Sequence, residues 1–275
     1  AFPRTESGRS LAIRDANDRV IAHICHGSRK DLRDAVEAAR KAQSSWANRT
    51  AYNRGQIIYR MAEMMEGKRD EFAQAIRSTG AAASLPSARK EVEASIDRLV
   101  AFAGWADKFP QMIGSQNPVA GPYYNFTIPE PTGVVAVVPP DEPALLALVS
   151  LLASVVVSGN AAVVIAGVAH PIPACIFGEV LATSDLPAGV VNIITAPRTE
   201  LLGHLASHRE IAAISAANLS KAEATTLRAG VAENLKRVHV ERRAADDWFN
   251  DAVSASPWTI EPFVEMKTIW HPMST

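Results

Sequence analysis

The sequence has no excess of charge of either sign and no long apolar run. Its 28 basic and 29 acidic residues leave a formal net charge of −1, so it lacks the basic surface that nucleic acids and anionic membranes attract. The most apolar run, residues 144–157, contains Ser150 and Ser154 and is shorter than the ~20 residues that a bilayer requires. The opening residues "AFPRTESGRS" lack the apolar core of a signal peptide. We therefore expect neither a nucleic-acid partner nor a membrane partner.

Cysteine is scarce, with only Cys25 and Cys175 in the sequence. They form no C-x-x-C pair, and a strand through His23, Cys25 and His26 places only two ligands on one face, too few for zinc. We therefore expect no metal site and a buried thiol, and two unpaired thiols indicate a cytoplasmic location. The sequence begins at Ala1 rather than Met, so we also expect a piece of a longer chain.

Residues 1–113 predict a hairpin followed by helices. The segment 10–26 alternates weakly around a polar turn, which is typical of a hairpin. Ser28 followed by Asp31 predicts a capping box at the start of a helix, and a second helix is expected from about Thr50.

A third helix is expected with Ser87 as its cap and Pro110 as its end. Helical spacing predicts which side chains of the second and third helices face inward: Ile57, Met61, Met64, Met65, Val92, Ile96, Leu99, Val100 and Ala103.

Residues 129–243 alternate between short β-branched runs and helical patterns. Runs that are apolar on both faces and separated by helices predict a doubly wound parallel sheet in an α/β fold. The expected strands are 134–138, 161–165, 191–194, 211–215 and 237–241, and the expected helices are 143–158, 172–183, 199–207 and 220–232.

Two further strands are expected outside this sheet, in residues 114–128 and 260–275. The first contains "YYNFTI" between proline and glycine breakers, which favours an edge or protruding strand. The second, "VEMKTIWHP", alternates regularly. The intervening segment 244–259 is polar and acidic, which predicts a weakly structured linker.

Several segments, in their order along the chain, resemble landmarks of the aldehyde dehydrogenase superfamily. They are "FAGWADKFP", "EPTGVVAVVPPDEP", "SGNAAVVIAG", "LPAGVVNIIT" and "NLKRVHVE", and "VEMKTIW" is similar to that family's C-terminal oligomerisation strand. The resemblance implies a cofactor-type α/β domain that carries a protruding oligomerisation β-flap. It also implies that a catalytic domain, which should follow the last strand of the sheet, is absent and replaced by the linker 244–259.

The resemblance also implies that the site residues have changed. A catalytic thiol is expected in the missing domain, and neither cysteine lies where it would serve as the nucleophile. Asp141 stands where the family has an asparagine that donates to an oxyanion, and a carboxylate accepts instead. Ile165 and Val168 stand where a lysine and a glutamate hold the ribose of the cofactor.

Of three further positions, two differ from the family pattern and one matches it. Asn218 and Glu223 replace two glycines that let pyrophosphate approach a helix start. Glu241 corresponds to the family's general base, but with no thiol to serve it is expected to pair with Arg242 or Arg243. These changes indicate a pseudoenzyme, with vestigial Asp141 and Glu241 and with no cofactor bound by this chain.

The retained flap implies a partner. Exposed strand edges need a strand to pair with, so we expect addition to another sheet or self-association. The resemblance to degenerate C-terminal modules of family-16 aldehyde dehydrogenases implies docking on a catalytic module that binds NAD, in the same polypeptide. Two alternatives stay open, a weak nucleotide-binding regulatory domain and part of an active NAD(P)-dependent oxidoreductase. The expected interface is Tyr123, Tyr124, Phe126, Ile128, Met266, Thr268, Ile269 and Trp270.

Overall fold

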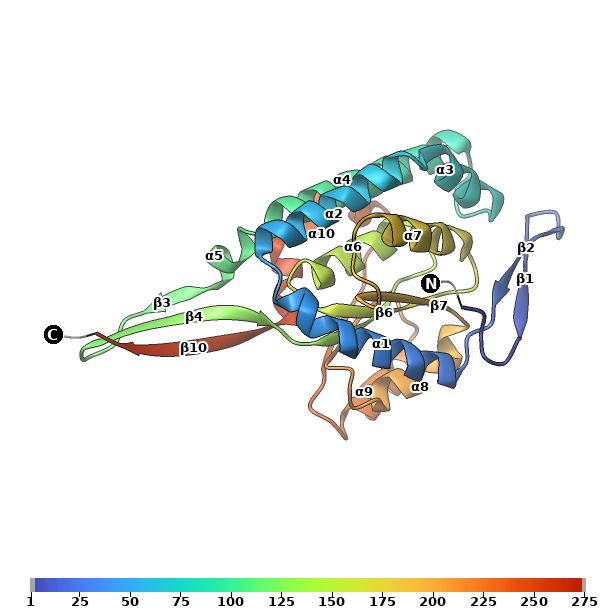
Figure 1. Ribbon diagram of the computed structural model, residues 1–275. Coiled ribbons are helices and arrows are strands. Elements are labelled where there is room, and N and C mark those ends of the chain that lie inside the picture. The colour runs from blue at the N-terminus through green and yellow to red at the C-terminus, as the bar shows by residue number, and fades with distance from the viewer. Residues whose placement is uncertain (1–2, 274–275) are drawn as a thin grey trace.

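A parallel five-stranded sheet lies at the centre of the computed structural model, which describes residues 3–273 (Figure 1). The strand order is β7-β6-β5-β8-β9, so the chain winds from β5 to one edge and then returns to build the other side. This is the doubly wound α/β sheet that the sequence predicted. The expected segments 1–113 and 260–275 include residues 1–2 and 274–275, which lie outside the described residues. The strands are β5 (Val134–Val138), β6 (Ala161–Ala166), β7 (Val191–Thr195), β8 (Ala213–Ala217) and β9 (Arg237–Glu241).

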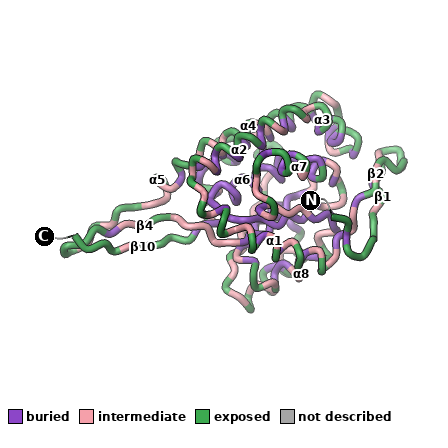
Figure 2. The backbone as a smooth tube through the Cα atoms, in the orientation of Figure 1, coloured by how far each residue is buried: buried purple, intermediate pink, exposed green. Residues whose placement is uncertain are grey.

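Alternate side chains of these strands enter two different cores. Val135 and Val137 lie in the larger core, whereas Val134 and Val138 lie in the smaller one on the opposite face. Because helices cover both faces, the central strands β5 and β6 are apolar along their whole length, and Figure 2 shows the buried band through the middle of the molecule. The larger core is covered by α2 (Ala51–Glu66), α4 (Leu85–Trp105), α6 (Leu146–Val156) and α7 (Ile172–Thr183), and the smaller by α1 (Arg29–Ala47), α8 (Arg198–Ser207) and α9 (Lys221–Val231).

Helix α6 corresponds to the most apolar run of the sequence, and all of its residues are buried. Its first turn has no capping side chain of its own, but Glu91 of α4 accepts hydrogen bonds from the backbone N–H groups of Leu145 and Leu146 at 2.7 and 3.2 Å. Burial raises the pKa of Glu91, and these two hydrogen bonds oppose that rise. Within residues 3–273 no helix is long and apolar enough to cross a membrane.

The predicted N-terminal hairpin is confirmed as β1 (Ser10–Arg14) and β2 (Val20–Cys25). It is fixed to the sheet where β7 ends, because Gly27 N donates to Thr195 O at 2.9 Å and Thr195 Oγ1 donates to Cys25 O at 2.6 Å. The capping box of Ser28 and Asp31 at the start of α1 is also confirmed.

The helical layer differs from the sequence-based expectations in four respects. Helix α3 (Arg69–Ser78) had not been predicted, and the cap of α4 is Ser84 rather than Ser87, whose N–H donates to the Ser84 hydroxyl at 3.2 Å. The proline between them fits inside the first helical turn, where no N–H partner is needed. Pro110 does not end α4 but lies in the short α5 (Phe109–Ile113), and Val100 is exposed rather than inward.

A three-stranded antiparallel ribbon protrudes from the body (Figure 1). Its strands are β3 (Ser115–Asn117), β4 (Tyr123–Pro131) and β10 (Val264–Pro272), in the order β10-β4-β3. The two long strands were predicted, and β3 was not. At the root, Asn160 accepts from Gly133 N at 2.8 Å and donates to Phe263 O at 2.7 Å, which ties β10 to the sheet.

The prediction of a weakly structured segment 244–259 is wrong. This segment forms η1 (Asp246–Phe249), α10 (Asp251–Ser254) and η2 (Pro257–Thr259), and η3 (Glu261–Phe263) follows. Trp248 is fully buried, and the buried Arg98 of α4 donates to Trp248 O at 2.8 Å and to Ser254 O at 3.1 Å. The segment is ordered by a guanidinium far away in the sequence, which its own composition does not reveal.

Candidate functional site

The candidate site lies at the carboxyl ends of β5 and β8, where the strand order reverses. Ligands of open α/β sheets bind in the crevice at such a switch point. The turn after β5 carries Asp141, and the turn after β8 carries Asn218. The sheet topology therefore brings two of the sequence-predicted positions to one edge.

Arg198 bridges two carboxylates at this edge. Its Nε lies 2.8 Å from Oε1 of Glu223, and its Nη2 lies 3.3 Å from Oδ2 of Asp141. Arg198 is the first residue of α8, directly after β7. A cation at a helix start is unfavourable to the helix dipole unless anions compensate it. That misplaced charge was the signal for Arg198, which the sequence analysis had not singled out.

Glu223 belongs to the start of α9 as well as to this bridge. Ser220 N donates to Glu223 Oε2 at 2.8 Å, and Glu223 N donates to Ser220 Oγ at 3.2 Å, which completes a capping box. Burial opposes ionisation of Glu223, but the hydrogen bonds from Ser220 and the charge of Arg198 outweigh it and lower its pKa. The helix start that would attract a phosphate is therefore occupied by a carboxylate of the same chain.

Asp141 also fills the approach to the turn after β6. A Cβ atom at Gly167 would lie 2.5 Å from Asp141 Oδ1, so this carboxylate lies against the backbone of that turn. Ile165 is 1% exposed and belongs to the smaller core, and Val168 is half-buried. Neither aliphatic side chain is able to donate or accept a hydrogen bond, as the ribose contacts of a cofactor require.

Asn218 adopts the left-handed backbone conformation, with φ of 53°. Asparagine tolerates this region better than most non-glycine residues. Its side chain forms two hydrogen bonds with the backbone of Arg243: Nδ2 donates to Arg243 O at 3.0 Å, and Arg243 N donates to Oδ1 at 2.9 Å. The position that the family resemblance assigns to a glycine thus joins the turn after β8 to the chain after β9.

Glu241, at the end of β9, forms an ion pair with Arg243 at 2.8 Å, one of the two partners expected for it. The Arg243 guanidinium lies over the ring of Trp248, 4.8 Å from its centroid, and donates to Ser254 Oγ at 2.6 Å. Only 16% of the Glu241 side chain is exposed. The carboxylate therefore lies beneath the segment 244–259.

The two cysteines lie on separate elements. Cys25 ends β2 and is half-buried, and Cys175 lies on α7. Desolvation raises the pKa of Cys175, and the neighbouring Cys25 and Glu179 side chains add to that rise, which disfavours the nucleophilic thiolate form of Cys175. Within residues 3–273 no group of three or more His, Cys, Asp or Glu side chains is arranged to hold a metal ion.

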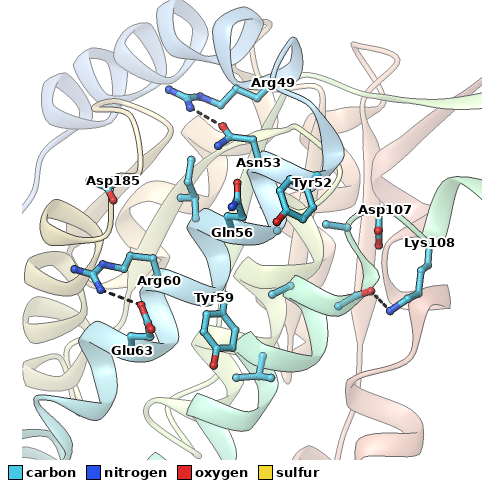
Figure 3. A pocket seen from close by; sticks show the side chains of 16 residues that line it. Arg49, Tyr52, Asn53, Gln56, Tyr59, Arg60, Glu63, Asp107, Lys108 and Asp185 are labelled. Atoms are coloured by element: carbon cyan, nitrogen blue, oxygen red, sulfur yellow. Dashed lines mark hydrogen bonds and ion pairs between the residues drawn. The ribbon is translucent and has the colours of Figure 1, made fainter.

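A groove of about 880 Å³ lies between α2 and α4, on the outer side of the helical layer (Figure 3). Tyr52 and Tyr59 are exposed along it, and charged side chains such as Arg60 and Glu63 pair with each other at 3.0 Å. None of the sequence-predicted site residues lines this groove. It is separate from the crevice at the switch point.

The ribbon divides the expected interface residues between its two faces. Register places Tyr123, Met266, Thr268 and Trp270 on one face, and Tyr124, Phe126, Ile128 and Ile269 on the other. On the first face, Trp270 packs edge-to-face on Tyr123 with ring centroids 5.8 Å apart, and Thr127 and Thr268 hydroxyls lie 3.0 Å apart. On the second, Tyr124 and Phe126 rings lie 5.2 Å apart. Both faces therefore expose aromatic side chains.

Comparison with known proteins identifies the source of this scaffold. The model of the aldehyde dehydrogenase family matches residues 3–249. The chain belongs to the aldehyde dehydrogenase family. It is 30% identical over 232 residues to cytosolic aldehyde dehydrogenase 1 of Mus musculus, covering 83% of this chain and 46% of that protein. It is also 30% identical over 242 residues to an aldehyde dehydrogenase of Emericella nidulans, covering 87% and 48%.

Solved structures, an aldehyde dehydrogenase among them, share the fold. The enzyme from Brucella melitensis biovar abortus 2308 superposes with a TM-score of 0.82 at 23% identity, over 88% of this chain and 50% of that one. PnpE in complex with nicotinamide adenine dinucleotide gives the same TM-score at 24% identity, over 87% and 49%. The chain thus spans about half the length of these relatives.

Proposed function

We propose that this chain is a non-catalytic module of the aldehyde dehydrogenase family that docks through its ribbon on a catalytic aldehyde dehydrogenase module. In this proposal the partner module binds NAD and carries the nucleophile, and the present chain supports assembly. The ribbon serves as the oligomerisation flap, and 244–259 stands in place of a catalytic domain.

The observation that carries the proposal is the bridge from Arg198 to Asp141 and Glu223. A dinucleotide needs free backbone N–H groups at a helix start and polar partners for its ribose. Here α9 is capped by its own Ser220 and Glu223, and a pyrophosphate would meet the Glu223 carboxylate. Asp141, in turn, would repel an oxyanion rather than stabilise it.

The ribbon supports the docking half of the proposal. Within residues 3–273 the outer edge of β10 pairs with no other strand, and Trp270 is 58% exposed beside it. An unpaired edge with exposed aromatic side chains is suited to strand addition onto another sheet.

Calorimetric titration of the purified chain with NAD and then NADP, up to millimolar nucleotide, tests the loss of cofactor binding. We expect no saturable heat. Saturable binding would overturn this half of the proposal and support a nucleotide-binding regulatory domain, whether or not the ribbon binds a partner.

Analytical ultracentrifugation of the chain mixed with a catalytic aldehyde dehydrogenase module tests docking. We expect a complex with the unchanged chain and none with the ribbon variant Trp270→Ser. Trp258→Ser is the matched control, because Trp258 is 56% exposed but lies in η2, outside the ribbon. A chain that stays monomeric alone and forms no complex would contradict the proposal.

A second candidate is one part of an active NAD(P)-dependent aldehyde dehydrogenase, favoured by the family match and by coverage of about half of each relative. Determining whether the coding frame contains a complete nucleophile motif outside these 275 residues, and assaying the full polypeptide, distinguishes the candidates. Activity that survives deletion of the present segment would favour the first.

A further inference from the structure

A small cavity lies between α6, β8, β9 and the segment 244–259. Its volume is about 20 Å³, and a single water molecule needs roughly 10–15 Å³ measured in this way. The residues that matter most for its chemistry are Ser150, Ser154, Ser215, Glu241 and Trp248. The cavity therefore has the size of one water molecule and a lining that mixes polar and apolar groups.

Three polar atoms of this lining have no hydrogen-bond partner within residues 3–273. They are the Ser215 hydroxyl, Oε1 of Glu241 and Nε1 of Trp248. Ser215 and Trp248 are fully buried. Leaving such groups without a partner in the interior is costly. Three of them around one cavity indicate a shared ligand.

The chemistry of these atoms selects the ligand. The indole N–H only donates, the carboxylate Oε1 only accepts, and the hydroxyl does either. An anion would be repelled by Glu241, whereas a cation would meet the indole N–H and the Arg243 guanidinium, 2.8 Å from the other Glu241 oxygen. A neutral molecule that both accepts and donates satisfies all three.

We propose that one water molecule is bound in this cavity, accepting from Trp248 and donating to Glu241, with Ser215 as its third partner. Because β8, β9 and η1 each supply one partner, the water joins the segment 244–259 to the sheet. Glu241 then has a structural role, since one of its oxygens holds Arg243 and the other holds the water.

Thermal unfolding of Ser215→Ala distinguishes a hydrated site from a dry one by the sign of the shift. If the water is bound, removal of the hydroxyl loses a hydrogen bond and lowers the unfolding midpoint by about 2–4 °C. In a dry cavity the same change removes an unsatisfied group and leaves the midpoint unchanged or higher. Ser184→Ala is the matched control, since Ser184 is fully buried but donates to Leu181 O at 3.2 Å.

A double-mutant cycle with Trp248→Phe isolates the bridging. Loss of packing in the phenylalanine variant cancels in the cycle, so coupling between residues 215 and 248 reports their shared ligand. We expect the cost of the second substitution to be smaller in the presence of the first. Additive midpoint shifts would overturn the bridge.

Oxygen-17 magnetic relaxation dispersion of the full chain counts long-lived internal waters directly and applies even where the double variant fails to fold. We expect one fewer long-lived water in Ser215→Ala than in the unchanged chain and in Ser184→Ala. Equal counts in all three proteins would overturn the proposal.

Discussion

The crevice at the switch point and the protruding ribbon differ in whether their polar groups find partners within the chain. In the crevice, Arg198 pairs with both Asp141 and Glu223, and the start of α9 is capped by its own residues. In the ribbon, β10 has an unpaired outer edge among the described residues, and Tyr123, Tyr124 and Trp270 are exposed. The carboxylates at the switch point are thus paired within the described part of the chain, whereas the outer edge of the ribbon is not, which is the contrast on which the proposed docking function rests.

The root of the ribbon should be far more sensitive than its tip. Asn160→Ala removes the acceptor of Gly133 N and the donor to Phe263 O in a buried environment. We expect the free energy of unfolding to fall by about 2–4 kcal/mol, measured by urea denaturation. Asn17→Ala, in the exposed β1–β2 turn, is the control and should change it by less than about 0.5 kcal/mol. Equal effects would show that the root does not stabilise the fold.

The Arg198 guanidinium in the crevice should contribute to the free energy of unfolding. Arg198→Ala leaves two neighbouring carboxylates without their shared partner, and we expect a loss of about 1–2 kcal/mol in urea denaturation. Arg40→Ala is the control: it breaks an exposed pair with Glu210, at 2.9 Å, and should cost about 0–1 kcal/mol. If Arg198→Ala instead stabilised the chain, the bridge would not hold the crevice together.

Lowering the pH should reduce the free energy of unfolding, because the Glu223 carboxylate becomes protonated. Its folded pKa lies below the ordinary value of 4.5, so its contribution is present above that value and is lost as pH falls through the lowered folded pKa. We expect Glu223→Gln to reduce the acid-induced loss of stability by less than about 1 kcal/mol, measured by urea denaturation between pH 6 and about pH 3. An identical pH profile in the variant would contradict this assignment.

Side chains at the tip of the ribbon should have the smallest effect on the free energy of unfolding of the isolated chain. Trp270→Ser and Tyr124→Ser, one on each face, remove exposed side chains, and each should change the free energy of unfolding by less than about 0.5 kcal/mol. Because Trp270→Ser is expected to abolish docking, the binding of Tyr124→Ser to a catalytic module then shows whether the partner also covers the second face. A large loss of stability in either variant would mean that the ribbon folds back on its own chain.

Strong local periodicity made the sheet predictable. Runs such as 134–138 and 161–165 are apolar at every position, and only strands covered on both faces require that. The boundaries were less certain: β8 begins at Ala213 rather than residue 211. Ser84 and Ser87 are both competent caps, and only the placement of the intervening proline separates them.

What the sequence did not reveal depends on distant partners. Arg98 orders the segment 244–259, and Glu91 caps α6 across a helix interface. In each case the charged residue lies on a mostly apolar helix face, and its partner depends on tertiary packing. The bridge through Arg198 was hidden for the same reason, although the sequence analysis had singled out its two partners, Asp141 and Glu223.

The anchoring of the ribbon has a mechanical consequence. Asn160 and Gly133 lie at the amino ends of β6 and β5, and Arg237, which donates to Val264 O, lies at the amino end of β9. The ribbon is thus attached at the amino-terminal end of the sheet, whereas the crevice lies at the carboxyl-terminal end. A torque applied by a partner would load several strands lengthwise, the direction in which a hydrogen-bonded sheet yields least. The body should then follow the partner as a rigid unit, without hinging at the root.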